Sequence, residues 1–308
     1  MNITSISSRQ QMTPARRIAP LVLAAALMLT GTAYGQDLRL QVLGSGGPEI
    51  DDGRASTGYL VFVDEKARAL VDLGPGVARN FEQTDAQIQD LDILLLSHLH
   101  VDHSADLPAI VKGLFFSRRT RPFLIAGPGA GTWFPDVTEF VASLFSETKS
   151  AYPYLSDYLS TATRDHLETI IASDNWKREV GKDLFVTAAS VNHGKVPALA
   201  WRIDVGRKSI VFSGDFSGSS GHLRTLAMGA DILVCHNAIP EEASGIARRL
   251  HAPPSIIGET AQAAQVKMLI LSHRMKRSTG NENETLQIIR QHYQGPVVFA
   301  EDLDSFKI

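Results

Sequence analysis

The sequence predicts an α/β fold in one large domain, residues 36–308. Short, nearly continuous apolar runs such as Leu91–Leu96 and Met268–Leu271 are typical of strands buried on both faces. Apolar residues recur at helical spacing in five other segments: Asp106–Phe116, Gly221–Met228, Glu241–Leu250, Ile256–Ala264 and Glu282–Tyr293. No internal repeat or low-complexity segment stands out, and the length suits a single domain of this class.

The first 35 residues are predicted to be a secretory signal peptide, outside the fold. Arg9, Arg16 and Arg17 precede an apolar stretch at 18–29, and Ala33-Tyr-Gly35 places small residues at the −3 and −1 positions of a cleavage site before Gln36. The stretch is shorter than the roughly 20 residues that a membrane span needs. We therefore expect a periplasmic or secreted protein with no stable membrane span after cleavage. An uncleaved membrane anchor is the alternative, and the sequence leaves Sec and twin-arginine export both open.

The most informative motif comes directly after the run Leu91–Leu96. It reads His98-Leu-His-Val-Asp-His103, so three imidazoles and one carboxylate fall within six positions. Zinc takes imidazole nitrogen and carboxylate oxygen at roughly 2.0–2.2 Å. His98 and His100 point the same way if the backbone is extended, whereas Asp102 and His103 follow as the chain turns and could serve a second ion. The alternative is a polar loop of solvated histidines.

Three further polar residues follow apolar runs later in the chain. His193 follows residues 184–192, Asp215 follows 210–214, and His273 follows 268–272. Each marks a junction where a strand passes into a loop, so each side chain leaves the core at one edge of a sheet. Considered alone, each of these three residues would be interpreted as a capping or loop residue. Together with the histidine motif, they favour a binuclear metal site.

This pattern resembles the metallo-β-lactamase fold superfamily of hydrolases, and within it the branch of ribonuclease Z, arylsulfatase and phosphodiesterase. The resemblance covers about residues 38–128 and 183–308. The segments that carry it are Val42-Leu-Gly-Ser-Gly-Gly47 with Arg54 and Ser56, Val71-Asp-Leu-Gly-Pro-Gly76, Asp106-Leu-Pro108, Val211-Phe-Ser-Gly-Asp215, Leu269-Ile-Leu-Ser-His273 and Val298-Phe-Ala-Glu-Asp-Leu303. It implies a four-layer αββα sandwich of two mixed sheets flanked by helices, with the metal site along one edge.

The resemblance also implies the ligands of two divalent ions per chain. Those of the first ion would be His98, His100 and His193. Those of the second would be Asp102, His103 and His273, with Asp215 bridging the two. A hydroxide between ions roughly 3.5–4 Å apart is a strong nucleophile near neutral pH, and Asp102 is expected to steer its proton as a catalytic residue. We expect Zn²⁺, with iron or manganese as alternatives.

Some segments depart from the family pattern. Ribonuclease Z enzymes carry His-Glu-Ala-Thr where this chain has Cys235-His236-Asn237-Ala238, so an amide replaces the acid. His251 resembles a histidine that assists leaving-group protonation, although Ala252-Pro253 replaces the usual Ser-Thr after it; a surface histidine before a proline turn is the alternative. His222 lies close in sequence to Asp215 and could contact substrate, or it could simply be solvated. Cys235 is predicted to be a small core residue.

Residues 128–181 are predicted to form a helical insert beside or over the active-site cleft. Phe140, Leu144 and Phe145 stand at helical spacing, and the segment is rich in aromatic residues, which favours an aryl or bulky leaving group. The alternative is that these aromatics are ordinary packing residues or a homodimer contact.

The charge balance argues against a nucleic-acid partner. Thirty basic residues against thirty-three acidic ones give a net charge of −3, and the basic runs are short, at Arg118–Arg121 and Lys276–Arg277. Nucleic-acid binders usually show a concentrated positive surface. An exported enzyme would also not meet precursor tRNA, so we expect a small-molecule ester substrate.

The expected function is therefore an exported binuclear-metal hydrolase that cleaves an ester, either a phosphodiester or an aryl sulfate, by a metal-bridged hydroxide. A lactonase or thioesterase on the same fold is the first alternative, although those branches usually follow the histidine motif with a glycine-rich turn, and Ser104-Ala-Asp-Leu-Pro108 follows it here. A non-catalytic metal-binding protein is the second alternative. It would be supported by a missing ligand, and all seven expected ligands are present.

Overall fold

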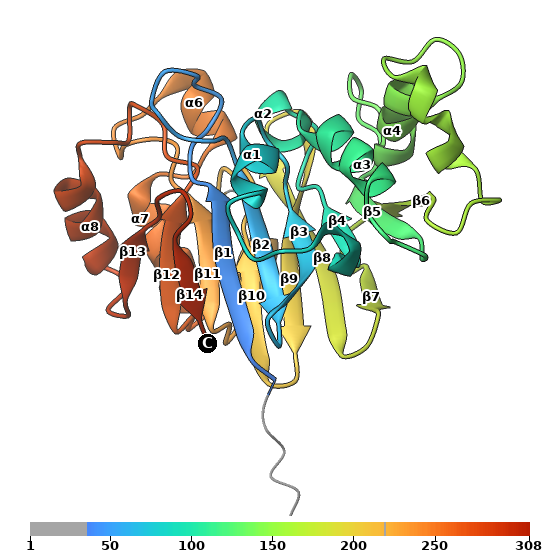
Figure 1. Cartoon of the computed structure of the whole chain (residues 1–308). Coiled ribbons are helices and arrows are strands. Elements are labelled where there is room, and N and C mark those ends of the chain that lie inside the picture. The colour runs from blue at the N-terminus through green and yellow to red at the C-terminus, as the bar shows by residue number, and fades with distance from the viewer. Residues whose placement is uncertain (1–35, 219) are drawn as a thin grey trace, which may run out of the picture. The chain divides into compact units, whose positions relative to one another are not determined.

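Two seven-stranded mixed sheets form the middle of the fold in the computed structural model, which describes residues 36–218 and 220–308 (Figure 1). The predicted signal peptide, 1–35, lies outside the described residues. Within them, no helix is both long and apolar enough to cross a membrane.

The first sheet contains the N-terminal strands and closes with the last strand of the chain. In spatial order its strands are β14 (Ser305–Lys307), β1 (Leu38–Gly44), β2 (Gly58–Val63), β3 (Lys66–Val71), β4 (Ile93–Leu95), β5 (Phe123–Pro128) and β6 (Leu167–Ala172). The pairs from β14 to β3 are antiparallel and the pairs from β3 to β6 are parallel.

The second sheet repeats this plan with the later strands. In spatial order they are β13 (Val297–Phe299), β12 (Met268–Ser272), β11 (Ile232–His236), β10 (Lys208–Phe212), β9 (Val196–Val205), β8 (Leu184–His193) and β7 (Lys177–Val180). The strands from β13 to β10 are parallel, and those from β10 to β7 are antiparallel.

The two sheets pack face to face through alternate residues of their strands. In β2, Tyr59 and Val61 point into the layer between the sheets, while Leu60 and Phe62 point to the outer face, as the period of two in a strand requires. Tyr59 of the first sheet packs on Phe212 of the second, with ring centroids 5.3 Å apart. Both faces of each sheet are therefore buried, which explains the nearly continuous apolar runs in the sequence.

Helices cover the two outer faces and complete four layers. On the first sheet they are α1 (Val77–Phe81), α3 (Leu107–Phe115) and α4 (Val137–Phe145); on the second they are α5 (His222–Leu226), α7 (Pro254–Ala263) and α8 (Glu282–Arg290). Two further short helices, α2 (Val101–Ser104) and α6 (Gly245–Leu250), and two 3₁₀ turns, η1 (Ile88–Asp90) and η2 (Pro153–Leu159), lie in the connections. The predicted αββα sandwich is confirmed, and each of the five predicted helical segments overlaps a helix.

Residues 128–181, predicted as a helical insert, are more closely built into the sandwich than that term implies. Besides α4 and η2 they contain β6, which pairs with β5 in the first sheet, and β7, which pairs with β8 in the second. Val137, Val141 and Phe145 of α4 are buried in the outer core of the first sheet. The strands escaped prediction because β6 and β7 are edge strands with partly exposed, mixed sequences and no clean alternation.

Candidate metal centre

The predicted ligands come together at the carboxyl ends of the central strands, where the two sheets meet. β4 leads to His98 and His100, and α2 directly after it carries Asp102 and His103. The others follow strands of the second sheet: His193 ends β8, Asp215 follows β10, His236 ends β11 and His273 follows β12. Parallel neighbours end at the same edge of a sheet, so β10, β11 and β12 bring their terminal side chains together.

Two glycines allow this crowding. The backbone of Gly214, just before Asp215, has φ of +56°, a left-handed conformation that glycine adopts without strain. At Gly74 a side chain would place its Cβ only 2.1 Å from the carbonyl oxygen of Asp102. The loop after β3 can therefore pass directly against the backbone of α2 only because residue 74 has no side chain.

The first group of ligands consists of His98, His100 and His193 together with Asp215, whose ligand atoms all lie within 4.8 Å of one another. His98 Nε2 is 3.0 Å from His100 Nδ1, and His193 Nε2 is 3.4 Å from the same atom. Ligands on a tetrahedron around zinc are separated by roughly 3.3 Å, given Zn–N distances of about 2.05 Å. The spacing of these nitrogens is therefore that of a metal's coordination shell.

The tautomers of two of these histidines are set by neighbours outside the group. The Nδ1–H of His193 donates to the carbonyl oxygen of Leu250 at 2.8 Å. Ser97 Oγ donates to Asp72 Oδ2 at 2.7 Å and is therefore free to accept from His98 Nδ1–H at 3.1 Å. With their Nδ1 atoms protonated, His98 and His193 both turn an Nε2 lone pair inward. Such outer hydrogen bonds fix the orientation of metal-binding imidazoles.

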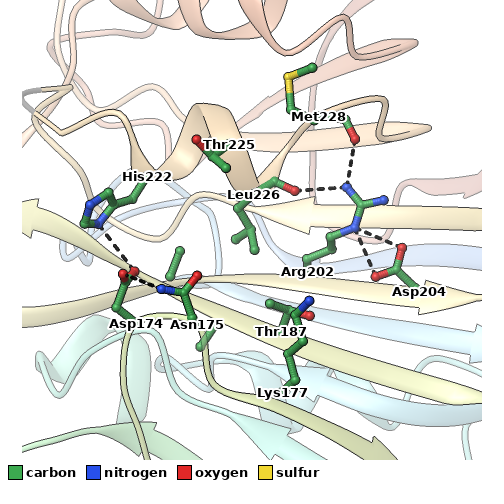
Figure 2. Close-up of a pocket in the computed structure, with 12 residues that line it drawn as sticks. Asp174, Asn175, Lys177, Thr187, Arg202, Asp204, His222, Thr225, Leu226 and Met228 are labelled. Atoms are coloured by element: carbon green, nitrogen blue, oxygen red, sulfur yellow. Dashed lines mark hydrogen bonds and ion pairs between the residues drawn. The ribbon is translucent and has the colours of Figure 1, made fainter.

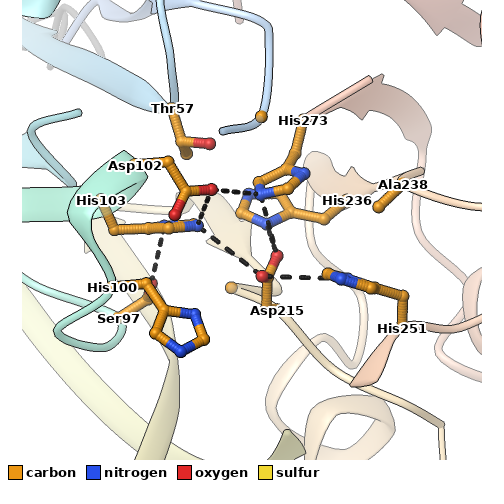
Figure 3. Close-up of polar contacts among 12 residues, drawn as sticks. Thr57, Ser97, His100, Asp102, His103, Asp215, His236, Ala238, His251 and His273 are labelled. Carbon is orange, nitrogen blue, oxygen red and sulfur yellow. Dashed lines mark hydrogen bonds and ion pairs between the residues drawn. The ribbon is translucent and has the colours of Figure 1, made fainter. Parts of the chain in front are cut away.

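The second group consists of His103, His236 and His273, again with Asp215. Asp102 lies beside it, with Oδ2 3.2 Å from His273 Nε2 and 3.5 Å from His103 Nε2 (Figure 3). His103 Nδ1–H donates to Asp72 Oδ2 at 2.8 Å, which leaves the Nε2 lone pair pointing inward. That Nε2 atom is buried and has no hydrogen-bond partner among the described residues.

Asp215 lies between the two groups. Its Oδ2 is 3.5 Å from His193 Nε2 and 3.8 Å from His98 Nε2 on one side, and 3.7 Å from His103 Nε2 on the other. Its Oδ1 is 3.4 Å from His273 Nε2. One carboxylate therefore faces the ligand atoms of both groups, which is the position of a bridging ligand.

The electrostatics of the cluster also suit a cation. Burial lowers the pKa of His98 well below its usual range and so favours the neutral imidazole that binds metals. Burial opposes ionisation of Asp215, but His273, His251 and His103 outweigh it and hold the pKa of Asp215 well below normal. The pKa of His103 is lowered by burial and raised more strongly by Asp102, Asp72 and Asp215. Without a metal, the cluster thus retains a proton that a metal ion would displace.

The backbone at His273 is strained, with φ of +52°. Positive φ is unusual for a residue with a side chain and persists where the surrounding structure enforces it, often at functional sites. Here Arg274, the next residue, forms an isolated bridge with Gly46 and donates its backbone N–H to the carbonyl oxygen of Ser45. The loop after β1 therefore holds His273 in its position.

Six of the seven predicted ligands belong to these two groups, whose donors can hold metal ions, and the seventh, Asp102, lies beside the second group. His236 was not predicted as a ligand. Its Nδ1–H donates to Asp215 Oδ1 at 2.8 Å, and its Nε2 lies 3.2 Å from the hydroxyl of Tyr59. Both ring nitrogens of His236 thus already have hydrogen-bond partners, so His236 is suited to orienting Asp215. The signal was present in the sequence, because His236 ends an apolar run as the other ligands do.

His251 and His222, the two weaker candidates, have different surroundings. His251 is only 7% exposed, so it is not a surface histidine, and its Nδ1 lies 3.8 Å from Asp215 Oδ2. Burial lowers the pKa of His251 to about 3, so the imidazole is neutral at neutral pH. His222, by contrast, is exposed on α5, and its Nδ1 donates to the carbonyl oxygen of Ser190. Cys235 is a buried core residue, as predicted.

A cavity of about 210 Å³ gives access to the cluster. Its walls include ligands of both groups and His251, together with the apolar residues Pro48, Leu250 and Met275 and the guanidinium-bearing Arg277. A larger open cavity of about 540 Å³ lies between α5 and β7–β9, outside this cluster (Figure 2). In the larger cavity Arg202 pairs with Asp204 and His222 with Asp174, and none of the candidate ligands lines it. We therefore assign the chemistry to the smaller cavity.

Comparison with known proteins agrees with this geometry. A family model described as a beta-lactamase superfamily domain matches residues 67–274. Ribonuclease Z of Mycobacterium avium (strain 104) is 27% identical to this chain over 88% of this chain and 98% of the relative. Ribonuclease Z of Clostridium novyi (strain NT) is 30% identical over 54% of this chain and 50% of the relative. The metallo-beta-lactamase fold protein YhfI from Bacillus subtilis superposes with a TM-score of 0.70 at 20% identity, over 88% of this chain and 100% of that chain, which is a likeness of fold.

Proposed function

The chain belongs to the beta-lactamase superfamily and is a metal-dependent hydrolase that acts on ester bonds, and on this premise we propose that it cleaves a small phosphodiester or an aryl sulfate with two divalent metal ions. The observation that carries the proposal is the position of Asp215 between two groups of imidazoles. A carboxylate shared in this way can bridge two adjacent ions. Two-metal sites supply a nucleophile near neutral pH and neutralise charge on the oxygens of the reacting ester.

In this proposal the first ion would be held by His98, His100 and His193, and the second by Asp102, His103 and His273, with Asp215 between them. Zn²⁺ suits imidazole and carboxylate donors, and Fe or Mn would be alternatives. His236 would orient Asp215, and Asp72 would orient His103, each through a hydrogen bond.

Asp102 and His251 are the proposed proton-handling residues, since both line the cavity. Burial raises the pKa of the Asp102 carboxyl, but His103 and His273 outweigh burial and lower it, so Asp102 is ionised and can accept a hydrogen bond that orients the proton of the attacking water. His251 is neutral at neutral pH, so it would donate a hydrogen bond to the leaving oxygen rather than carry a full positive charge. This is a narrower role than the leaving-group protonation inferred from the sequence.

Aromatic residues beside the first ligand group favour an aryl ester. The ring of Phe134 packs against His100 with centroids 5.7 Å apart, in an edge-on geometry. Trp133 is 69% exposed, and Lys195, two residues after His193, places its Nζ 4.5 Å from the centre of the indole ring. An exposed indole next to a cation offers a stacking surface for an aromatic group that carries negative charge nearby.

The distribution of basic residues supports a small substrate rather than a nucleic acid, even though relatives are named ribonuclease Z. In the first basic run, Arg119 donates to carbonyl oxygens including that of Arg121, and Arg121 pairs with Asp92 at 2.9 Å. In the second, Lys276 pairs with Asp51. Arg121 and Lys276 are therefore neutralised by carboxylates, and the side chain of Arg119 is taken up by backbone carbonyl oxygens, so these short runs do not form a continuous positive surface.

Export to the periplasm or beyond is a further part of the proposal, and it rests on the sequence of residues 1–35 alone. Its test is fractionation of cells that make the full chain. We expect mature protein beginning near Gln36 outside the cytoplasm, and a full-length cytosolic species would contradict it.

Turnover of three substrates tests the activity. Metal-loaded protein is assayed with an aryl phosphodiester, an aryl sulfate and a lactone, each with and without a chelator. We expect chelator-sensitive cleavage of the phosphodiester or the sulfate. Turnover of the lactone alone would assign the protein to acyl-transfer chemistry. No turnover of any of the three substrates by protein with metal bound would contradict the proposed substrate class.

A further inference from the structure

We propose that Arg277 binds the negatively charged group of the substrate, so that the enzyme selects esters with an anionic oxygen beside the scissile bond over neutral ones. This inference rests on the proposed function and narrows its substrate class. Arg277 lies four residues after the ligand His273 and lines the cavity that contains ligands of both groups. Nothing in the sequence motif alone distinguishes it from the neighbouring cations.

The guanidinium of Arg277 is held in place without being neutralised. Its Nε donates to the carbonyl oxygen of Ala238 at 2.8 Å, in the loop just after His236, and its Nη2 contacts the Met275 sulfur at 3.1 Å. No carboxylate of the described residues forms an ion pair with it. A planar guanidinium fixed along one edge keeps further N–H donors available in a defined direction, which suits recognition of phosphate or sulfate oxygens.

The neighbouring cations show the opposite arrangement. Arg274 donates from Nη1 to Glu301 at 2.8 Å and also pairs with Glu282. Lys276 pairs with Asp51, and its backbone N–H donates to Glu49. In this segment, the cation that reaches the cavity is thus the one without an acidic partner, while those that do not line it are neutralised.

The surroundings of Arg277 favour a substrate with one negative charge over a substrate with many. Pro48, Leu250 and Met275 form apolar walls of a cavity of only about 210 Å³, and Arg277 is an exposed cation that lines it. The loop that supplies Pro48 continues with Glu49, Asp51 and Asp52, and its contacts with Lys276 place it beside the same segment. A single guanidinium next to an acidic loop suits a small monoanionic ester better than a polyanionic chain.

Steady-state kinetics of four proteins test the inference: the wild type, Arg277→Gln, Arg277→Lys and Lys276→Gln. The last is a matched control, because it removes the same charge from the adjacent residue. The substrate is ethyl 4-nitrophenyl phosphate, a monoanion. Hydrogen bonds to charged groups are typically worth enough to change affinity by roughly 10–100-fold. We therefore expect Arg277→Gln to raise KM by about that factor, Arg277→Lys to recover part of it, and Lys276→Gln to change KM by less than about threefold.

A second readout separates substrate binding from a structural role. Metal content and the affinity for diethyl phosphate, an inert anion, are measured by titration for the same variants. Weaker anion binding with unchanged metal content supports the inference. An unchanged KM and anion affinity in Arg277→Gln, an equal effect of Lys276→Gln, or a loss explained by lost metal would overturn it. If the wild type turns over neither a phosphodiester nor an aryl sulfate, the proposed function fails, and the anion titration still decides the role of Arg277.

Discussion

Asp72 is predicted to control metal affinity without touching the metal. Its carboxylate accepts three hydrogen bonds: from the backbone N–H of Ser97 at 2.7 Å, from Ser97 Oγ at 2.7 Å and from His103 Nδ1 at 2.8 Å. The last bond sets the tautomer in which His103 Nε2 faces the cluster. In Asp72→Asn the amide keeps the volume but has only one accepting oxygen for these three donors, so the His103 bond is weakened or lost.

The magnitude follows from two effects. Loss of an outer hydrogen-bond partner of a metal ligand typically lowers metal affinity by about 10–100-fold, or roughly 1.4–2.7 kcal/mol. A buried donor left without a partner costs a further ~1–3 kcal/mol of folding stability, independent of metal. We therefore expect Asp72→Asn to fold, with a second metal ion that binds about 10–100-fold more weakly and a first ion that is less affected.

The assay is competition with a chelator of known affinity, with bound metal measured by elemental analysis, alongside urea unfolding of the metal-free protein. Asp231→Asn is the matched control. Asp231 is also buried and accepts from Ser209 N–H at 2.8 Å and Lys267 Nζ at 2.7 Å, but it precedes β11 and so lies at the opposite end of the strand from His236. If both variants lose similar stability and neither loses metal affinity, the assigned role of Asp72 is refuted.

Three other predictions can be checked with standard methods. First, a chelator should lower the thermal midpoint, because an ion present at 100 times its Kd stabilises by about 2.7 kcal/mol; an unchanged midpoint in protein shown to have lost its metal would count against the cluster as a metal site. Second, burial lowers the pKa of His236 from 6.5 to about 4, so the unfolded chain binds more protons between these pH values and stability must fall as pH drops from 6.5 towards 4. Urea unfolding of the metal-free protein should show that the unfolding free energy depends less steeply on pH in His236→Gln than in the wild type, by up to about 1.4 kcal/mol per pH unit. Equal slopes in the two proteins would contradict the lowered pKa of His236. Third, Trp133→Ala should raise KM for an aryl phosphodiester by roughly 5–10-fold if stacking contributes ~1 kcal/mol, with little change for an alkyl phosphodiester. Equal effects on the two substrates would argue that Trp133 has no part in binding the aryl group.

The candidate metal ligands could be found in the sequence because each follows a strand that the sequence marks clearly. An apolar run that ends in His or Asp reports both the strand and the point where its side chain leaves the core. The motif His98–His103 adds four donors within one such junction. These signals lie in short segments, so they can be recognised without knowing how the strands are ordered in the sheets.

The roles of the supporting residues depend on which strands are neighbours, and this is decided only in the folded chain. His236 reaches Asp215 because β11 lies between β10 and β12. Asp72 reaches His103 because β3 pairs with β4, although 31 residues separate the two side chains. The free guanidinium of Arg277 could not be told from Lys276 in the sequence, because the difference lies in the distant acidic residues that neutralise one cation and not the other.

The sequence by itself thus determined the fold class and the donors that can hold metal, since strand periodicity and strand ends are properties of short segments. Tertiary structure decided that β6 and β7 extend the two sheets, that Asp215 faces both ligand groups, and that Arg277 lines the cavity without an ion pair to any described residue. The physical reason is the same in each case: a hydrogen bond or an ion pair depends on distances of a few ångströms between segments, and these distances exist only after the sheets have formed.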